Sequence, residues 1–304
     1  MHTKNNLIVK ITSLLLVIFL GFGNIAQVNA AFRGNEMSVG FDHVISISDP
    51  ANEEAPVEDL AEPTDTTVEP AEESPDAEIF APDTGWYGDG SATEFYIGTV
   101  DELEGLDQLV TGGTTFAGKT IYLTADLDLA GKTFLPIGTK DTNFNGTFNG
   151  QNHTISNLNR TLGSSGSHAG LFARIGASGA ANRAHFLNLN LTGFYLKAFN
   201  YVGGLAGQSV NALVDNVHVA NSEFYGEQYV GGLIGYLNAE IKNSSATSIT
   251  IDHAGYSWFL NPHYGHKMGG LGGYVIGGSL TAPKVFDNNT ATNVSVSGAR
   301  ECGG

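Results

Sequence analysis

The sequence predicts an all-β protein whose short strands wind into a parallel solenoid, and three observations support this. The chain has 40 glycines among 304 residues and 15% charged side chains, a composition typical of turn-rich β proteins. A Gly-Gly-Leu unit and a unit ending in asparagine alternate along its second half. Alternating apolar and polar residues follow each asparagine, which indicates half-buried strands. Units of this size cannot bury their own apolar face, so they must stack.

The first thirty residues predict a secretory signal peptide. Lys4 and Lys10 precede the apolar stretch 11–22, and small residues follow up to Ala30, after which we expect cleavage. The apolar stretch is shorter than the roughly 20 residues that cross a bilayer, so an uncleaved anchor is the less favoured alternative. We therefore expect a secreted or cell-surface protein with no transmembrane segment in the mature chain. With one cysteine the chain cannot form an internal disulfide, and disulfide-free secreted chains are common among bacterial surface proteins, so we expect a bacterial source.

An acidic segment follows the signal peptide. Residues 48–85 hold thirteen acidic side chains, no basic ones and six of the nine prolines. Charge repulsion and the scarcity of large apolar groups predict that residues 31–85 form a disordered, extended spacer. A tail that binds calcium or a cationic partner is the alternative. The whole chain has 31 acidic and 14 basic residues, which argues against a nucleic-acid partner.

Residues 86–150 are expected to form an N-terminal cap and the first strands. Thr99-Val-Asp-Glu102 has the form of a capping box, and Gly112-Gly113 marks the end of the helix. Between them the apolar residues have helical spacing: Leu103, Leu106, Leu109 and Val110. The pattern predicts a helix over 99–110. Such a helix would cover the first coil, whose apolar, unpaired edge would otherwise be exposed.

The Gly-Gly-Leu units divide residues 151–304 into coils. Their leucines are Leu171, Leu205, Leu233 and Leu271, and their glycines are Gly170, Gly203, Gly204, Gly231, Gly232, Gly269 and Gly270. We expect the leucines to point inward. The glycines are expected at coil corners, often with positive φ, where stacking leaves no room for a Cβ. With two or three short strands in each unit, the closed coil is a parallel β-helix, and right-handed is the usual hand of parallel crossovers.

The second repeated unit ends in an asparagine. The residues are Asn157, Asn188, Asn216, Asn243 and Asn288. We expect them at another corner, where the side-chain amide bonds turn backbone and stacks on the asparagine of the next coil. Both repeated units are interpreted as structural, not as a ligand site.

The order of these segments resembles a known family. The resemblance lies in the run from Phe95 to Leu129, Leu135-Pro-Ile-Gly138, the two Asn-Gly turns of 144–150 and the Val-Gly-Gly-Leu-x-Gly units. In these segments the chain resembles β-helical proteins that carry the GLUG motif. The resemblance covers about residues 95–300 and implies GLUG-type repeats over 151–304. Such repeats occur in adhesin-like bacterial surface proteins and in the non-catalytic part of some IgA-cleaving metallopeptidases. No His-Glu-x-x-His is present, so the resemblance implies no peptidase chemistry here.

No motif predicts a catalytic residue, a cofactor or a metal site. The sequence has no Gly-x-Ser-x-Gly elbow, no phosphate loop and no zinc-type Cys/His spacing. Acidic residues after position 130 are scattered, so we expect no enzyme. Because stacked coils can bring distant carboxylates together, a polysaccharide lyase or glycosidase remains the alternative, with Asp215 and Asp252 as its first candidates.

The insertion 252–267 is the candidate binding segment. Its candidate residues are His253, Tyr256, Trp258, Tyr264 and His266. Loops on a rigid solenoid collect binding residues, and these aromatic rings could stack on a sugar or enter a partner's pocket. His253, His263 and His266 could instead hold a metal. The third possibility is a loop whose rings only cover the coil beneath, because aromatic residues are often simply buried.

These observations together predict a non-catalytic surface module. The expected role is adhesion, with a host or matrix protein or a glycan as the partner. A polysaccharide-active enzyme and a pure scaffold for a further domain, such as a peptidase, are the alternatives. We expect the sequence to be the first part of a longer protein, because no motif typical of a solenoid cap follows the last coil.

Overall fold

The chain divides into two units, Met1–Glu72 and Glu73–Gly304. The computed structural model describes residues 29–33, 36–40, 81–179, 183–255, 267–279, 282–297 and 301–303. In the first unit these residues form two antiparallel strands, β1 (Asn29–Arg33) and β2 (Glu36–Gly40), at the junction of the predicted signal peptide and spacer. Most of both predicted segments lies outside the described residues.

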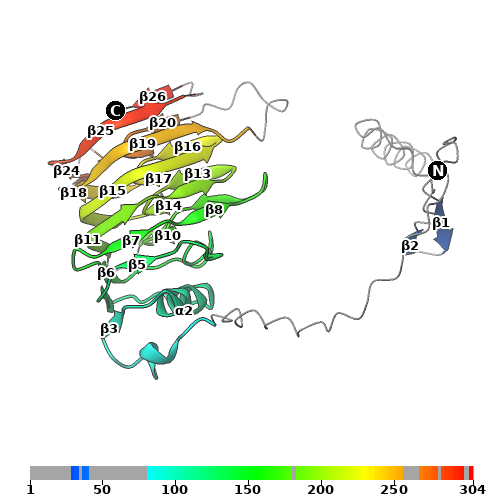
Figure 1. Ribbon diagram of the computed structural model, residues 1–304, viewed down its shortest axis with the longest axis horizontal. Helices are drawn as coiled ribbons and strands as arrows, with labels where there is room; N and C mark the ends of the chain where they lie inside the picture. The colour runs from blue at the N-terminus through cyan, green and yellow to red at the C-terminus, as the bar shows by residue number, and fades with distance from the viewer. Residues whose placement is uncertain are drawn as a thin grey trace, which may run out of the picture. The chain divides into compact units, whose positions relative to one another are not determined.

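Parallel strands stacked in coils build the second unit (Figure 1). A four-stranded sheet contains β10 (Phe172–Ile175), β14 (Ala206–Ser209), β17 (Ile234–Leu237) and β21 (Gly272–Val275). A five-stranded sheet contains β9 (Ser167–Ala169), β13 (Asn200–Gly203), β16 (Gln228–Gly231), β20 (Lys267–Gly269) and β26 (Glu301–Gly303).

The third sheet has 13 strands and runs the length of the unit. Its main path contains β3 (Glu94–Ile97), β4 (Thr120–Leu123), β6 (Thr147–Asn149), β11 (Ala184–Thr192), β15 (Ala212–Gly226), β18 (Ala239–Lys242) and β24 (Phe286–Asp287). Beside this path lie β5 (Leu127–Asp128), β7 (Thr154–Ser156), β8 (Asn159–Thr161), β12 (Tyr195–Lys197), β19 (Ser245–His253) and β25 (Thr290–Val296). A separate antiparallel pair joins β22 (Gly278–Ser279) to β23 (Ala282–Pro283).

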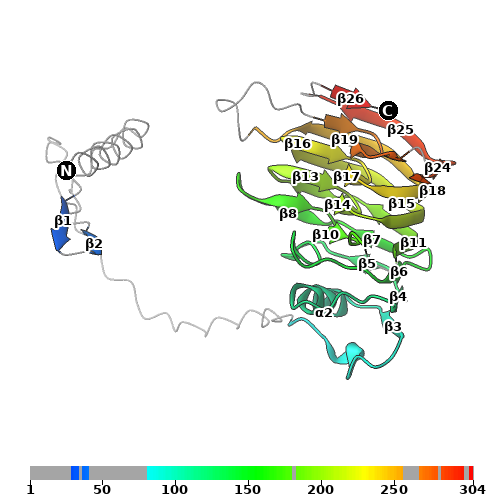
Figure 2. The same cartoon turned by 180° about the vertical axis from the view of Figure 1, so that it is seen from behind.

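The register shows why these sheets form a solenoid. Val202 of β13 pairs with Val230 of β16, and Ala206 of β14 pairs with Ile234 of β17. Both pairings are parallel and join a residue to its counterpart one repeat later in the chain. The strands therefore stack coil on coil from α2 to β26, as both views show (Figures 1 and 2). The predicted parallel β-helix is confirmed.

One α-helix caps the first coil. The helix α2 (Val100–Thr111) follows a short 3-10 turn, η1 (Gly85–Tyr87). Thr99 Oγ1 accepts a hydrogen bond from the Glu102 backbone N–H at 3.2 Å, and a Glu102 carboxylate oxygen accepts one from the Thr99 backbone N–H at 3.0 Å. Leu103, Leu106 and Val110 are buried in the core, so the predicted helix and its capping box are both present. Within the described residues, no helix has the length and apolar run needed to cross a membrane.

The interior of the solenoid changes along its axis. The first coils are filled by phenylalanine rings, among which the rings of Phe144 and Phe172 lie 5.4 Å apart and those of Phe172 and Phe186 5.0 Å apart. Later coils are filled by aliphatic residues such as Val214 and Ile241, which pair across β15 and β18 and are fully buried. The same coil cross-section is thus filled by a few large rings or by several smaller side chains.

The repeated glycines lie at close backbone contacts, but the expected positive φ is wrong for them. A Cβ on Gly231 would lie 2.2 Å from the Ile234 carbonyl oxygen and 2.7 Å from the Gly273 nitrogen. One on Gly232 would lie 2.2 Å from the Gly270 oxygen. None of the repeat glycines has positive φ. Glycine is needed there because neighbouring coils occupy the space of a side chain, not because the backbone is left-handed.

The left-handed conformation falls instead on the repeated asparagines. All five have positive φ, between 48° and 60°: Asn157, Asn188, Asn216, Asn243 and Asn288. Asn216 Nδ2 donates to Asn188 Oδ1 at 2.9 Å, and Asn288 Nδ2 donates to Asn243 Oδ1 at 2.9 Å. Asn157 and Asn243 donate to aspartates of the preceding coil, Asp128 and Asp215. We call these five residues the asparagine corner.

Candidate functional site

A column of aromatic rings runs along the five-stranded sheet. It contains His168 of β9, Tyr201 of β13 and Tyr229 of β16, each one residue before the Ala-Gly or Val-Gly of its repeat. The ring centroids of His168 and Tyr201 lie 4.5 Å apart and those of Tyr201 and Tyr229 lie 5.1 Å apart, with interplanar angles of 21° and 23°. The three rings are stacked, one per coil, and all are half-buried at the surface.

A second column lies beside the first, on the four-stranded sheet. Tyr236 of β17 pairs with Tyr274 of β21, and their ring centroids lie 5.3 Å apart. The ring of Tyr229 contacts both, at 5.7 Å and 5.6 Å. We call His168, Tyr201, Tyr229, Tyr236 and Tyr274 the aromatic face.

The last glycine of each repeat brings the two columns together. A Cβ on Gly235 would lie 2.5 Å from the Tyr229 carbonyl oxygen, and one on Gly273 would lie 2.4 Å from the Val230 nitrogen and 2.6 Å from the Tyr229 carbonyl carbon. Without a side chain there, the backbones of the two sheets can approach closely. The residue after each of these glycines, Tyr236 or Tyr274, then lies next to the first column.

The backbone of the first column is strained. His168, Tyr201 and Tyr229 have φ of 66°, 57° and 55°, a region that bulky residues rarely occupy. Each such residue costs about 1–3 kcal/mol, and strain of this kind clusters at functional sites. Glycine or asparagine would hold the same conformation at lower cost. Folding therefore does not require these rings, which makes the column a candidate binding site.

Polar and basic side chains surround the rings. Ser167, Asn200 and Gln228 pair across β9, β13 and β16, next to the first column. Lys267 Nζ lies 4.4 Å from the centroid of the Tyr274 ring, and Arg174 and Gln208 continue the second column towards β10. The basic residues of these columns in the described part of the chain are Arg174 and Lys267, and Lys267 pairs in register with Glu301 of β26.

Burial sets the protonation of the face at neutral pH. It lowers the pKa of His168, and the nearby charges of Arg174 and Lys140 act in the same direction, so the imidazole is neutral. A hydrogen bond with the Gln208 side chain partly offsets this effect. Burial raises the pKa of Tyr201 and Tyr236, so their hydroxyl groups stay protonated and can donate hydrogen bonds.

Of the residues predicted in the insertion, the structure places His253. It ends β19, and its Nε2 lies 2.5 Å from Oε2 of Glu227, whose side chain is only 2% exposed. The Gly255 backbone N–H donates to His253 Nδ1 at 3.0 Å, so Nε2 carries the proton of a neutral ring. Tyr256, Trp258, Tyr264 and His266 lie outside the described residues, and so does His263. Their predicted binding role stays a prediction.

The acidic residues considered for catalysis have structural partners. Asp215 Oδ1 accepts a hydrogen bond from Asn243 at 2.9 Å, and Asp252 Oδ1 accepts one from the His253 backbone N–H at 2.6 Å. Within the described part of the chain, no three His, Cys, Asp or Glu side chains converge to hold a metal ion. His218 also has structural partners, since Ser245 and Asn216 bond its two ring nitrogens.

A family model matches the repeat that carries Tyr229 and Tyr236. The model described as "The GLUG motif" matches residues 226–252, from the end of β15 through β16, β17 and β18 to β19. The chain carries a GLUG motif. The matched residues include Tyr229 and Tyr236, so the aromatic face is built on the GLUG coil and its neighbours.

Two further comparisons find proteins with some similarity to this chain. Halomucin of Haloquadratum walsbyi is 32% identical over 163 residues, which cover 50% of this chain and 2% of halomucin, so the chain spans a small fraction of that protein's length. A crystal structure of a proposed immunoglobulin A1 protease from Bacteroides ovatus is 14% identical, with a TM-score of 0.33; the match covers 67% of this chain and 77% of that one. The parallel pairing of the strands themselves defines the fold.

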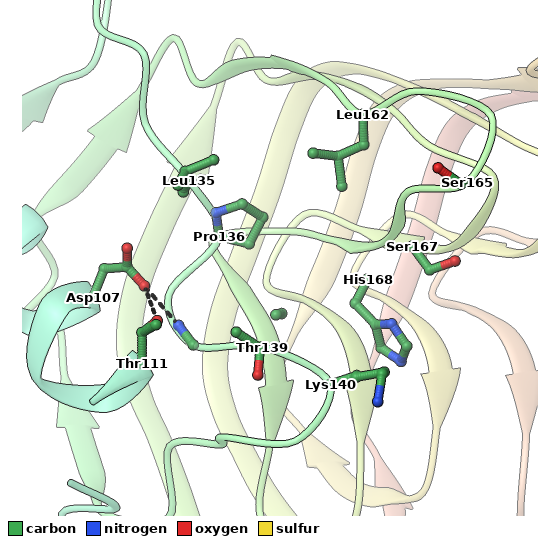
Figure 3. Close-up of a pocket in the computed structure, with 12 residues that line it drawn as sticks. Asp107, Thr111, Leu135, Pro136, Thr139, Lys140, Leu162, Ser165, Ser167 and His168 are labelled. Atoms are coloured by element: carbon green, nitrogen blue, oxygen red, sulfur yellow. Dashed lines mark hydrogen bonds between the residues drawn. The ribbon is translucent and has the colours of Figure 1, made fainter. Parts of the chain in front are cut away.

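A pocket of about 500 Å³ lies at one end of the aromatic face of the GLUG solenoid (Figure 3). Leu135, Pro136, Leu162 and Ala173 supply apolar walls. Figure 3 shows Asp107 and Thr111 of α2 on one side, and His168 and Lys140 on the other. His168 belongs to both the pocket and the aromatic face, so the two surfaces are continuous.

The sequence analysis missed the aromatic face. A signal was present, because tyrosine precedes Val-Gly-Gly-Leu at Tyr201 and Tyr229, and tyrosine follows the closing glycine at Tyr236 and Tyr274. Aligning the GLUG repeats one residue further on each side reveals both columns. That the columns touch depends on the coil cross-section, which the repeats alone do not give.

Proposed function

We propose that this chain is a secreted, non-catalytic surface module that binds a glycan through the aromatic face. The observation that carries the proposal is the stacked column of His168, Tyr201 and Tyr229, held in a backbone conformation that glycine or asparagine would adopt with less strain. Secretion and surface location rest on the predicted signal peptide.

The chemistry of the face suits a sugar chain. Tyrosine presents a flat apolar surface with a polar end at low cost in conformational entropy, and the C–H faces of pyranose rings pack on such surfaces. The rings recur once per coil, at roughly 4.8 Å along the axis, which is close to the length of one sugar unit in an extended chain. An extended glycan lying along the axis would therefore meet a ring at each unit.

The neighbouring side chains can bond sugar hydroxyl groups. Asn200, Gln228 and Gln208 lie beside the rings, and an amide both donates and accepts hydrogen bonds. Asn200 Oδ1 is buried and has no hydrogen-bond partner among the described residues. A buried acceptor without a partner costs stability, so a ligand hydroxyl group that donates to it would gain affinity.

The test is a glycan and matrix-protein array with the full-length secreted chain and a Tyr201→Ala/Tyr229→Ala variant. The matched control is Tyr96→Ala/Tyr122→Ala, which removes another stacked pair, 5.3 Å apart on β3 and β4, away from the face. We expect the face variant to lose glycan affinity about tenfold or more, because two ring contacts of about 0.5–1.5 kcal/mol each are lost. The control variant should bind like the wild type.

Three results would overturn the proposal. Wild-type protein that binds no glycan, or only a matrix protein, contradicts it directly. Equal binding by the face variant and the control excludes the aromatic face. A Tyr256→Ala/Trp258→Ala/Tyr264→Ala variant that alone abolishes binding would place the site on the insertion.

A further inference from the structure

The pocket at the end of the aromatic face has a polarised lining. On the α2 side, Asp107 Oδ1 accepts hydrogen bonds from the Gly138 backbone N–H at 2.9 Å and from Thr111 Oγ1 at 2.9 Å (Figure 3). Burial raises the pKa of Asp107, although these bonds partly offset the effect. One oxygen of this carboxylate is therefore held by the cap, on the side of the pocket opposite Lys140 and His168.

The opposite side of the pocket is basic. Lys140 and His168 line it, and Arg174 Nη1 donates to the Lys140 carbonyl oxygen at 2.9 Å. The Arg174 Nε atom is buried and has no hydrogen-bond partner among the described residues. Asp141 pairs with Lys140 at 2.5 Å, but both side chains are largely exposed, and such surface pairs contribute little. The guanidinium group of Arg174 is a hydrogen-bond donor suited to carboxylate and sulfate groups, so an anion is the complementary ligand.

The other end of the face has one basic residue next to an acidic one. Lys267 lies over the Tyr274 ring and pairs in register with Glu301 of β26. A neutral glycan would need only the rings and the amides. The cationic residues at the pocket end, Lys140 and Arg174, on a chain with an excess of acidic residues, indicate that the ligand is negatively charged.

We propose that the glycan is acidic, and that the pocket beside His168 is an end subsite for a sugar unit that carries a carboxylate or a sulfate. This inference rests on the proposed glycan function of the aromatic face. Lys140 binds the anionic group, Arg174 adds positive charge beside it through its bond to the Lys140 carbonyl oxygen, and His168 supplies a neutral hydrogen-bonding group and a ring surface. Leu135, Pro136 and Leu162 cover the apolar part of the unit.

The test measures the affinity of the full-length chain for three oligosaccharides of equal length: a neutral one, one with uronate units and one with sulfated units. The variants are Lys140→Gln and Arg174→Gln. Lys242→Gln is the matched control, since it removes one positive charge from β18, outside the face. We expect wild-type protein to bind at least one acidic oligosaccharide about tenfold more tightly than the neutral one, and both pocket variants to lose that preference.

The results separate this inference from the proposed function. Equal affinity for all three oligosaccharides, or an unchanged preference in both pocket variants, overturns the acidic subsite while glycan binding stands. Loss of the preference in Lys242→Gln as well would mean that only the overall charge matters, which also overturns it. Failure of every oligosaccharide to bind, or normal binding by Tyr201→Ala/Tyr229→Ala, overturns the proposed function itself.

A second measurement covers the case in which a pocket variant does not fold. His168 faces Arg174, Lys140, Asp141 and Gln208, and its pKa lies below the usual 6.5. As the pH falls through that pKa, the imidazole gains a positive charge, so affinity for the acidic oligosaccharide should rise while affinity for the neutral one does not. His168→Asn suits the left-handed backbone and should abolish the rise. A wild-type affinity that does not change with pH contradicts a direct contact between His168 and the anion.

Discussion

Two corners of the solenoid share a left-handed backbone conformation, but the free-energy cost of that conformation is low at one corner and high at the other. At the asparagine corner, left-handed residues such as Asn188 and Asn216 bond one another from coil to coil. At the aromatic face, the left-handed residues are His168, Tyr201 and Tyr229. Asparagine adopts positive φ at little cost, whereas an aromatic residue does so at about 1–3 kcal/mol.

The polar groups of the two corners differ in the same way. The amides of the asparagine corner are satisfied by neighbouring coils, as for Asn216, whose Nδ2 donates to Asn188 and whose Oδ1 bonds His218. Beside the aromatic face, Asn200 Oδ1 and Arg174 Nε are buried without partners among the described residues. A repeated residue therefore does not by itself indicate a binding site. Buried polar atoms without hydrogen-bond partners and a strained backbone distinguish the aromatic face from the asparagine corner.

The largest effect is expected from a change that breaks the stacking on which both corners depend. Gly231→Ala would place a Cβ 2.2 Å from the Ile234 oxygen, with backbone atoms of the next coil as further neighbours, so nothing can move aside. We expect a loss of more than about 4 kcal/mol and insoluble protein, measured by soluble yield and circular dichroism. Gly163→Ala is the control, since its Cβ would meet nothing within 4 Å. A folded Gly231→Ala protein would show that the coils are not packed this closely.

An intermediate effect is expected at the asparagine corner. Asn216→Ala removes the bonds to Asn188 and His218 and puts alanine at φ 56°, so it should cost about 1–3 kcal/mol in urea unfolding. Asn216→Gly keeps the left-handed backbone free of strain and should recover about 1 kcal/mol of that loss. Glycan affinity should be unchanged in both. A loss of affinity would mean that the two corners are not independent.

The smallest change in stability is expected where an asparagine replaces a ring of the aromatic face. Tyr229→Asn loses contacts with the neighbouring rings but relieves a left-handed backbone, so it should be about 1 kcal/mol more stable than Tyr229→Ala. Both variants should lose glycan binding to a similar extent. Equal stability of the two would remove the argument from strain, whereas retained binding by either would exclude Tyr229 from the site.

The sequence predicts a structural feature well when the residues that determine it lie within one short segment. The helix was predicted at 99–110 and found at Val100–Thr111, because its capping box and its buried leucines lie within one short segment. The positive φ expected of the repeat glycines was wrong, since close approach and left-handed geometry both favour glycine and the sequence does not tell them apart. The candidate site was placed on the insertion, where only His253 among its five residues is described.

The sequence by itself determined the repeat, the parallel coil and the cap, because each follows from short motifs whose backbone geometry is local. Only the tertiary structure placed Tyr201 beside Tyr236, at 6.0 Å, and joined His168 to a pocket walled by Leu135 and Leu162. Those contacts join different sheets of different coils. They depend on how closely two backbones approach at Gly235 and on where α2 covers the first coil, and both are properties of the packed solenoid rather than of any single repeat.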